Sequence, residues 1–148
     1  MKITVYRALT TLLAVLGLAD AVYLTDMALM GSALTCDIAG LDGCNVVAQS
    51  SFSQFLGFPL ALYGVVFYLL FLLTFWVSTY KISHGTKRLV FLVAIAGAVF
   101  STYFLYLQFF VIQALCIYCL GSAFIAYALT LLTGTRVRKS EVPEEVSS

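Results

Sequence analysis

The chain has 148 residues, of which 62% are hydrophobic and 10% are charged, and its mean hydropathy is +1.03. So little charge excludes an ordinary soluble domain. With a formal net charge of only +1, we also expect no nucleic-acid partner. The composition therefore predicts an integral membrane protein.

Four apolar segments are long enough to cross a bilayer, which takes about 20 residues. The predicted spans cover residues about 8–30, 58–80, 89–112 and 115–133. Residues 89–133 carry no charge, and as one helix they would be about 68 Å long, so the chain must turn within them, near Gln113. We predict an all-α four-helix membrane domain over 1–135, followed by a disordered cytoplasmic tail over 136–148.

The basic residues predict the orientation of these spans. All eight Lys and Arg lie before the first span, between the second and third, or after the fourth. The positive-inside rule then places both termini in the cytoplasm, and the 31–57 loop and the turn near Gln113 outside the cell membrane. A cleaved signal peptide is the alternative for the first segment, because Ala19-Asp20-Ala21 resembles a cleavage site, but the apolar run continues to Met30.

Four cysteines lie at two places on this outer side. Cys36 and Cys44 lie in the 31–57 loop, and Cys116 and Cys119 form a C-x-x-C motif at the start of the last span. Outside the cytoplasm they could form structural disulfides. A C-x-x-C pair at a helix N-terminus instead favours a reactive thiolate, because the helix dipole lowers its pKa. We expect no metal site, since His84, the single histidine, lies in the inner loop.

Residues 45–56 of the outer loop alternate apolar and polar side chains at near-helical spacing. This pattern predicts a short amphipathic helix that half-inserts into the membrane and caps the bundle. Gly57-Phe58-Pro59 then leads into the second span. Two dithiols beside a lipid-accessible cap predict electron transfer between a soluble thiol and a lipid-soluble oxidant such as a quinone.

These features together resemble the vitamin K epoxide reductase (VKOR) family, in a prokaryotic-type form without a fused thioredoxin-like domain. The resemblance covers about residues 23–127. It rests on Cys36-x7-Cys44, the Gly57-Phe58-Pro59-Leu60-Ala61-Leu62-Tyr63-Gly64 segment, Tyr103, and Cys116-Ile117-Tyr118-Cys119. It implies four helices around a quinone (menaquinone, ubiquinone or phylloquinone-like) and a separate secreted thioredoxin-like partner. We expect a monomer.

The resemblance also implies roles for single residues. Cys36 would exchange disulfides with the partner, Cys44 would shuttle to Cys116, and Cys119 would contact the quinone. The implied quinone contacts are Val47, Phe52, Leu60, Tyr63, Phe67, Phe104, Gln108 and Ala123. Vertebrate enzymes carry a hydrogen-bonding Asn and Tyr where this chain has Leu60 and Ala123, which favours a simple respiratory quinone. The replacement donor would be Tyr63, Tyr103, Gln108 or Ser122.

Asp20 lies about 18 Å into the first span, where an ionised group is costly. We expect it to hydrogen-bond a neighbouring span, with protonation of the reduced quinone as the alternative.

The predicted function is a membrane thiol:quinone oxidoreductase that supports disulfide formation outside the cytoplasm. The alternatives are a vitamin K (epoxide) or quinone reductase with the same cysteines, a carrier of reducing equivalents outward, and a non-catalytic, disulfide-stapled scaffold or transporter subunit.

Overall fold

The computed structural model describes residues 3–32, 43–81 and 83–141, without the side chains of 140 and 141. The predictions for Cys36, and for the tail beyond residue 141, lie outside these residues. Within the described ranges, four helices are long and apolar enough to cross a membrane: α1 (Ile3–Met30), α3 (Leu60–Tyr80), α4 (His84–Tyr106) with its continuation η1 (Leu107–Ile112), and α5 (Ile117–Glu141). The fold is therefore a four-helix membrane bundle.

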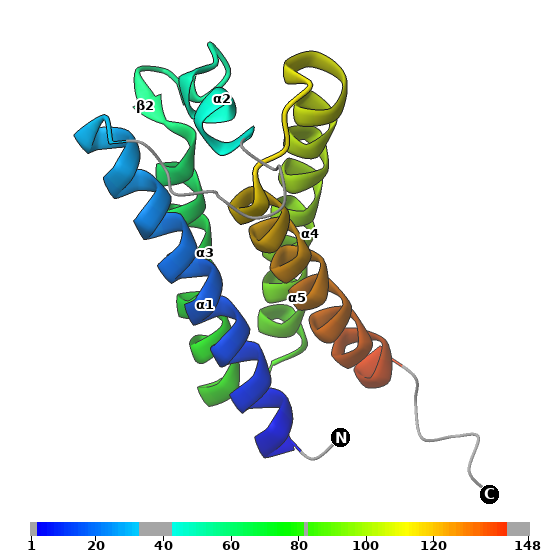
Figure 1. Ribbon diagram of the computed structural model, residues 1–148. Helices are drawn as coiled ribbons and strands as arrows, with labels where there is room; N and C mark the ends of the chain where they lie inside the picture. The colour runs from blue at the N-terminus through cyan, green and yellow to red at the C-terminus, as the bar shows by residue number, and fades with distance from the viewer. Residues whose placement is uncertain (1–2, 33–42, 82, 142–148) are drawn as a thin grey trace, which may run out of the picture.

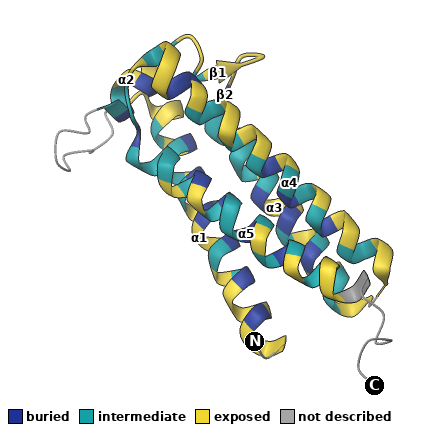
Figure 2. Ribbon diagram, turned by 90° about the vertical axis from the view of Figure 1, so that its right-hand side faces the viewer, coloured by how far each residue is buried: buried dark blue, intermediate teal, exposed yellow. Residues whose placement is uncertain are grey.

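The four helices form a ring in which each packs against two neighbours, in the order α1, α3, α4, α5 and back to α1. In Figure 1 both termini lie at one end of the bundle, and α2 lies at the other. We call the first the terminal end, where α1 starts at Ile3 and α5 finishes at Glu141. The second is the thiol end, which carries Cys44 and Cys116. In Figure 2 exposed residues, coloured yellow, run along the outer faces of the spans, as expected for surfaces that face lipid.

The core of the terminal half is built mainly of aromatic and small side chains. Phe71 is fully buried, and its ring stacks on Phe75 with the centroids 6.0 Å apart. Small residues let large rings lie across the helix interfaces: a Cβ added to Gly17 would overlap Tyr68, and one added to Gly97 would overlap Phe67. This close packing fixes the spacing of the spans.

The cap at the thiol end is shorter than the sequence pattern predicts. Helix α2 covers only Gly43–Gln49, whereas the pattern predicted helix over 45–56. The Ser50 hydroxyl donates to the carbonyl of Val47, and the Ser53 hydroxyl to that of Ser50. Such bonds compete with helical hydrogen bonds.

A small hairpin follows α2. Strands β1 (Gln54–Phe55) and β2 (Phe58–Pro59) pair antiparallel. Leu56 and Gly57 between them both have positive φ, as a tight two-residue hairpin loop requires. Pro59 is the N-cap of α3.

Two differences from the predicted spans concern helix ends. The turn near Gln113 forms as expected: Gln113 has a φ of 55° and ends η1. The last turns of α4 are wide, with π-helical hydrogen bonding over Leu107–Ile112, which the sequence did not indicate. Helix α5 continues to Glu141, so residues 136–141 are helical rather than part of the disordered tail. Arg138 and Lys139 in its last turn complement the helix dipole.

Candidate redox site

The cysteines of the thiol end lie in one buried cluster. Cys44 on α2 is 1% exposed and Cys116, just before α5, is 2% exposed. Both pack with Val47, and Cys119 packs against the same cluster. Cys44 is disulfide-bonded, whereas Cys116 and Cys119 are free thiols. Cys44 and Cys116 are 72 residues apart in sequence, so the fold brings a bonded cysteine and a reduced C-x-x-C pair together.

Gly43 allows this close approach. A Cβ added at this position would overlap the backbone of Leu115, the residue before Cys116. The first turn of α2 therefore rests directly on the segment that leads into α5. A larger residue at position 43 would push Cys44 away from Cys116.

The first turn of α5 stabilises a thiolate at Cys116. The backbone N–H of Cys119 donates to Cys116 Sγ at 3.4 Å. The hydrogen bond from the Cys119 thiol lowers the pKa of Cys116 most, the backbone N–H groups of Cys119 and Tyr118 lower it further, and burial opposes them. The net direction is a Cys116 pKa below that of an ordinary thiol. Since the thiolate is the form that exchanges disulfides, Cys116 is suited to react with a neighbouring sulfur.

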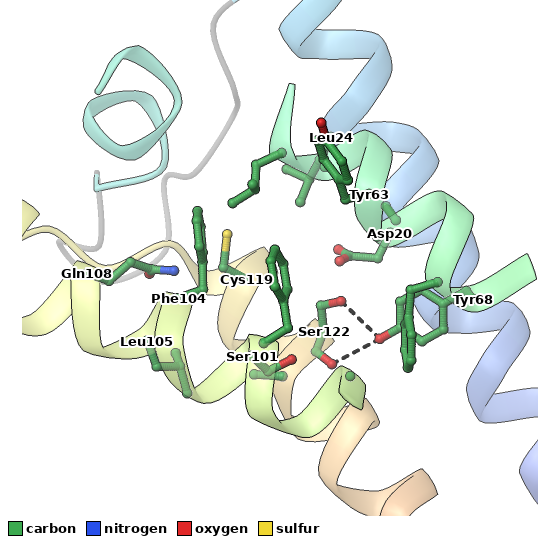
Figure 3. Close-up of a pocket in the computed structure, with 18 of the residues that line it drawn as sticks. Asp20, Leu24, Tyr63, Tyr68, Ser101, Phe104, Leu105, Gln108, Cys119 and Ser122 are labelled. Carbon is green, nitrogen blue, oxygen red and sulfur yellow. Dashed lines mark hydrogen bonds between the residues drawn. The ribbon is translucent and has the colours of Figure 1, made fainter. Parts of the chain in front are cut away.

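A cavity of about 330 Å³ opens inside the bundle beside Cys119. Its size falls at the lower end of ligand pockets, about 300–1,000 Å³. Figure 3 shows Cys119 and Phe104 on one side and Asp20 on the other. We call this space the main cavity. It is lined by Asp20, Ala21, Leu24, Leu60, Ala61, Tyr63, Gly64, Phe67, Tyr68, Ala96, Gly97, Phe100, Ser101, Phe104, Leu105, Gln108, Cys119, Ser122 and Ala123.

A second cavity of about 240 Å³ lies between α2 and the bundle. Cys44, Val47 and Cys116 line it, and Cys119 lines both this cavity and the main one. Cys119 therefore stands between the two spaces, whereas Cys116 faces only the second of them. This division separates a sulfur suited to exchange with Cys44 from a sulfur suited to meet a molecule in the bundle.

Most of the predicted quinone contacts surround the main cavity. They are Leu60, Tyr63, Phe67, Phe104, Gln108 and Ala123. Val47 lines the second cavity instead. Phe52 lines neither, and 45% of its surface is exposed. The reason is that α2 ends at Gln49, so Phe52 is not on the cap helix that was expected to point it inward.

Gln108 carries a buried donor of this cavity that has no partner among the described residues. Its Oε1 accepts from the backbone N–H of Cys116 at 3.0 Å, and its Nε2 is buried with no hydrogen-bond partner. Of the other candidates, Tyr63 donates to the carbonyl of Phe55, Ser122 Oγ pairs with Tyr68, and Tyr103 does not line the cavity. The wide turn of η1 carries Gln108, and such π-helical turns are frequent at functional sites.

The residues present fit a quinone ring in the main cavity. The walls are mostly apolar and include Tyr63, Phe67, Phe100 and Phe104, which suit a flat hydrophobic ring. A buried amide N–H without a partner is costly, and a quinone carbonyl would satisfy Gln108 Nε2. Among the described residues, no three of His, Cys, Asp and Glu come together as metal ligands.

Comparison with known proteins agrees with the motifs. Residues 8–134 match the vitamin K epoxide reductase family. The chain belongs to this family. It is also 33% identical, over 134 residues, to the thiol-disulfide oxidoreductase LTO1 of Arabidopsis thaliana. The match covers 86% of this chain but 35% of the relative, so this VKOR-family chain spans about a third of that protein's length.

Proposed function

We propose that this protein is a membrane thiol:quinone oxidoreductase, which oxidises a thioredoxin-like protein outside the cytoplasm and passes the electrons to a membrane quinone. The observation that carries the proposal is the position of Cys119 between a cavity shared with Cys44 and Cys116 and an apolar cavity in the bundle. Membership of the VKOR family and the likeness to a thiol-disulfide oxidoreductase support it.

The proposed chemistry begins at the C-x-x-C pair. Cys119 passes an electron pair to the quinone, and Cys116 closes a disulfide onto Cys119, so that two thiols are oxidised and one quinone is reduced to its hydroquinone. The Cys44 thiolate then attacks Cys116 and releases Cys119. Cys36 attacks Cys44 and releases Cys116, which restores the reduced pair and leaves a Cys36–Cys44 disulfide.

The partner completes the cycle. Its first thiolate attacks Cys36 and releases Cys44, and its second thiol resolves the mixed disulfide and releases Cys36. The net reaction converts one partner dithiol and one quinone into one disulfide and one hydroquinone. A bonded Cys44 beside free Cys116 and Cys119 corresponds to the state in which the oxidising equivalent lies on the outer cysteines.

Residues of the main cavity would hold and orient the quinone. We propose that Gln108 donates from Nε2 to one carbonyl oxygen, while its Oε1 holds the backbone of Cys116. One side chain would thus fix the ring relative to the C-x-x-C turn. The aromatic walls exclude water and keep the ring beside Cys119, which is the positioning that a two-electron transfer needs.

Turnover by the purified protein tests this function. The protein in lipid nanodiscs, given reduced thioredoxin-like protein and a short-chain ubiquinone or menaquinone, is expected to form one partner disulfide for each hydroquinone. Cys36→Ala, after quinone is added, is expected to accumulate a Cys44–Cys116 disulfide, because the Cys36 thiol that would attack Cys44 and release Cys116 is then missing. Thiol oxidation without any quinone reduction would contradict the proposal.

A further inference from the structure

The proposed reaction must deliver two protons to the quinone along with two electrons, and the present inference rests on that proposed function. We propose that Asp20 is a catalytic acid, which donates one of these protons to quinone bound in the main cavity. The sequence analysis favoured a structural hydrogen bond from Asp20 to a neighbouring span. The geometry points instead to the alternative.

Asp20 reaches into the main cavity and finds no polar partner there. It lines the cavity from α1, and its Oδ2 is buried without a hydrogen bond among the described residues. The neighbouring polar groups are already paired: Tyr68 Oη lies 3.0 Å from both the carbonyl and the hydroxyl oxygen of Ser122. Figure 3 shows the carboxyl of Asp20 turned into the space that faces Cys119.

The main cavity contains no cation among its lining residues. An ionised carboxylate without a counter-charge is costly at membrane depth, and such residues usually mark functional sites. A protonated carboxyl instead carries one transferable proton. Gln108 can donate a hydrogen bond to a quinone oxygen, as can the Ser101 hydroxyl that also lines the cavity, but an amide and a hydroxyl are poor acids. Asp20 is the one carboxylic acid among the lining residues.

The step balances with one proton taken up from the solvent. Asp20 gives its proton to one quinone oxygen as Cys119 passes over the electron pair, and the proton of the Cys119 thiol goes to the second oxygen. The Cys116 thiolate then closes the disulfide onto Cys119, and the Asp20 carboxylate takes up one proton from the solvent. The products are one hydroquinone and one Cys116–Cys119 disulfide, and Asp20 ends as it began.

The test compares two isosteric substitutions on the same helix. Asp20→Asn keeps the shape and a hydrogen-bonding amide but removes the acid. Asp26→Asn is the matched control, because Asp26 is exposed on α1 and lines neither the main nor the second cavity. In a single-turnover reaction of the reduced protein, Asp20→Asn is expected to slow hydroquinone formation by about 10²-fold or more. Asp26→Asn should match the wild type, and Asp20→Glu should recover part of the rate.

Two outcomes separate this inference from the proposed function. If the wild type reduces quinone and Asp20→Asn does so at the rate of Asp26→Asn, Asp20 is not the acid. If the wild type reduces no quinone, the proposed function itself fails. Thermal denaturation of Asp20→Asn controls for folding, and the rate of disulfide exchange at Cys44 should stay unchanged in this variant.

A different observation at the terminal end carries a second inference, independent of the redox reaction. A cavity of about 310 Å³ opens there among α1, α3, α4 and α5, and four of its lining side chains are cations: Arg7, Lys87, Arg136 and Lys139. We infer that this cavity binds the phosphate of an anionic phospholipid headgroup.

The cations of this cavity have no carboxylate counter-charge among the described side chains. The acids that are described, Asp20 and Asp26, follow Arg7 by at least 13 residues on α1, which is about 20 Å along a helix. The guanidinium of Arg136 lies 4.3 Å from the centre of the Tyr6 ring. A phosphate is the anion that clustered Lys and Arg side chains recognise.

The apolar residues that line this cavity favour a lipid over free phosphate as the ligand. Ile3, Tyr6, Phe75 and Val90 line the same cavity, so an acyl chain or glycerol backbone can lie against apolar surface while the phosphate meets the cations. Basic pockets between spans on the cytoplasmic side bind anionic headgroups in this way. The positive-inside rule places this end of the bundle on that side.

Lipid-dependent stability tests this site. Wild-type protein is expected to retain phosphatidylglycerol through native mass spectrometry and to melt at a higher temperature in nanodiscs that contain it than in pure phosphatidylcholine. The variant Lys87→Gln with Arg136→Gln should lose both effects. The matched control is Arg88→Gln with Arg138→Gln, which removes the same charge from exposed positions outside the cavity.

Equal losses in the two double variants would mean diffuse attraction to the membrane surface and would overturn the site. A second experiment adds inorganic phosphate to the protein in pure phosphatidylcholine nanodiscs. If phosphate alone stabilises the protein as much as phosphatidylglycerol does, the ligand is not a lipid. Retention of phosphatidylglycerol by the cavity variant would also contradict the inference.

Discussion

The two ends of this bundle use the same four helices in different ways. In the terminal half, regular helices pack aromatic rings such as Phe71 and Phe75 against small residues. At the thiol end, regularity breaks down: η1 widens, Gln113 adopts a left-handed conformation, and Asp20 and Gln108 each leave a buried polar atom without a partner. Thr10 Oγ1, in the terminal half, is the third such atom among the described side chains. Unpaired polar groups destabilise a fold, and those of Asp20 and Gln108 line the same cavity as Cys119, which indicates a place shaped for reaction rather than for stability.

The largest expected effect is on the sulfur that faces the main cavity. Cys119→Ala should abolish quinone reduction, because Cys44 and Cys116, the other cysteines that the structure describes, do not line that cavity. Single-turnover absorbance of the quinone measures the effect. Cys119→Ser should be equally inactive, since a hydroxyl cannot form the disulfide, and activity in either variant would show that electrons leave from another sulfur.

The next effect concerns the contact between the two cysteine segments. Gly43→Ala should slow electron transfer from Cys44 to Cys116 by about 10²-fold, the order expected for a misplacement near 1 Å. The reason is that the added Cβ overlaps the backbone of Leu115. Quinone reduction by the already reduced Cys116 and Cys119 should continue, so a stopped-flow comparison of the two half-reactions isolates the contact.

Gly121→Ala is the matched control for this substitution, because a Cβ at Gly121 meets no atom within 4 Å. It should leave both half-reactions unchanged. If Gly43→Ala also transfers electrons at the wild-type rate, close approach of α2 to Cys116 is not needed for the relay.

A substitution in the terminal half should show the opposite pattern. Phe71→Ala removes a fully buried ring and is expected to lower the free energy of unfolding by about 3 kcal/mol. The remaining folded protein should keep its activity. Leu73→Ala, at a 63% exposed position on the same helix, should change stability little. Thermal denaturation in detergent measures the stability of both variants. A loss of specific activity in folded Phe71→Ala would show that the terminal half contributes to the reaction as well as to stability.

The smallest expected effect is a shift in pH dependence. Because the hydrogen bond from Cys119 lowers the pKa of Cys116, the thiolate should persist at pH values below the ordinary thiol range and disappear as the pH falls through the lowered pKa. Thiolate ultraviolet absorbance of the reduced C-x-x-C pair measures the midpoint. Cys119→Ala should move the Cys116 midpoint upward, and a midpoint that stays in place or falls would contradict the assigned cause.

The large features of the fold could be predicted from the sequence because they depend on composition. Span length, the absence of charge over 89–133 and the position of Gln113 follow from the hydrophobic thickness of a bilayer. The extent of the cap could not be predicted this way. The amphipathic pattern of 45–56 continues past Gln49, but the hydroxyls of Ser50 and Ser53 bond to the backbone and end α2, so Phe52 lies outside the site.

The candidate site divides in the same manner. The C-x-x-C motif could be read from the sequence itself. The resemblance implied Leu60, Tyr63 and Phe67, and their spacing, which places them on one helical face, agrees with their position in the main cavity. The choice of Gln108 over Tyr63 or Ser122 could not, because it depends on which donors are already paired. Asp20 carried a sequence signal, its depth in a span, but only the cavity shows what it faces.

The central claim is that Cys116 and Cys119 deliver electrons to a quinone in the main cavity. Its most direct test is one addition of quinone to protein reduced at this pair, followed by disulfide mapping by mass spectrometry. The account predicts one hydroquinone per protein together with a Cys116–Cys119 disulfide. Free thiols at both positions after quinone has been supplied in excess would contradict it.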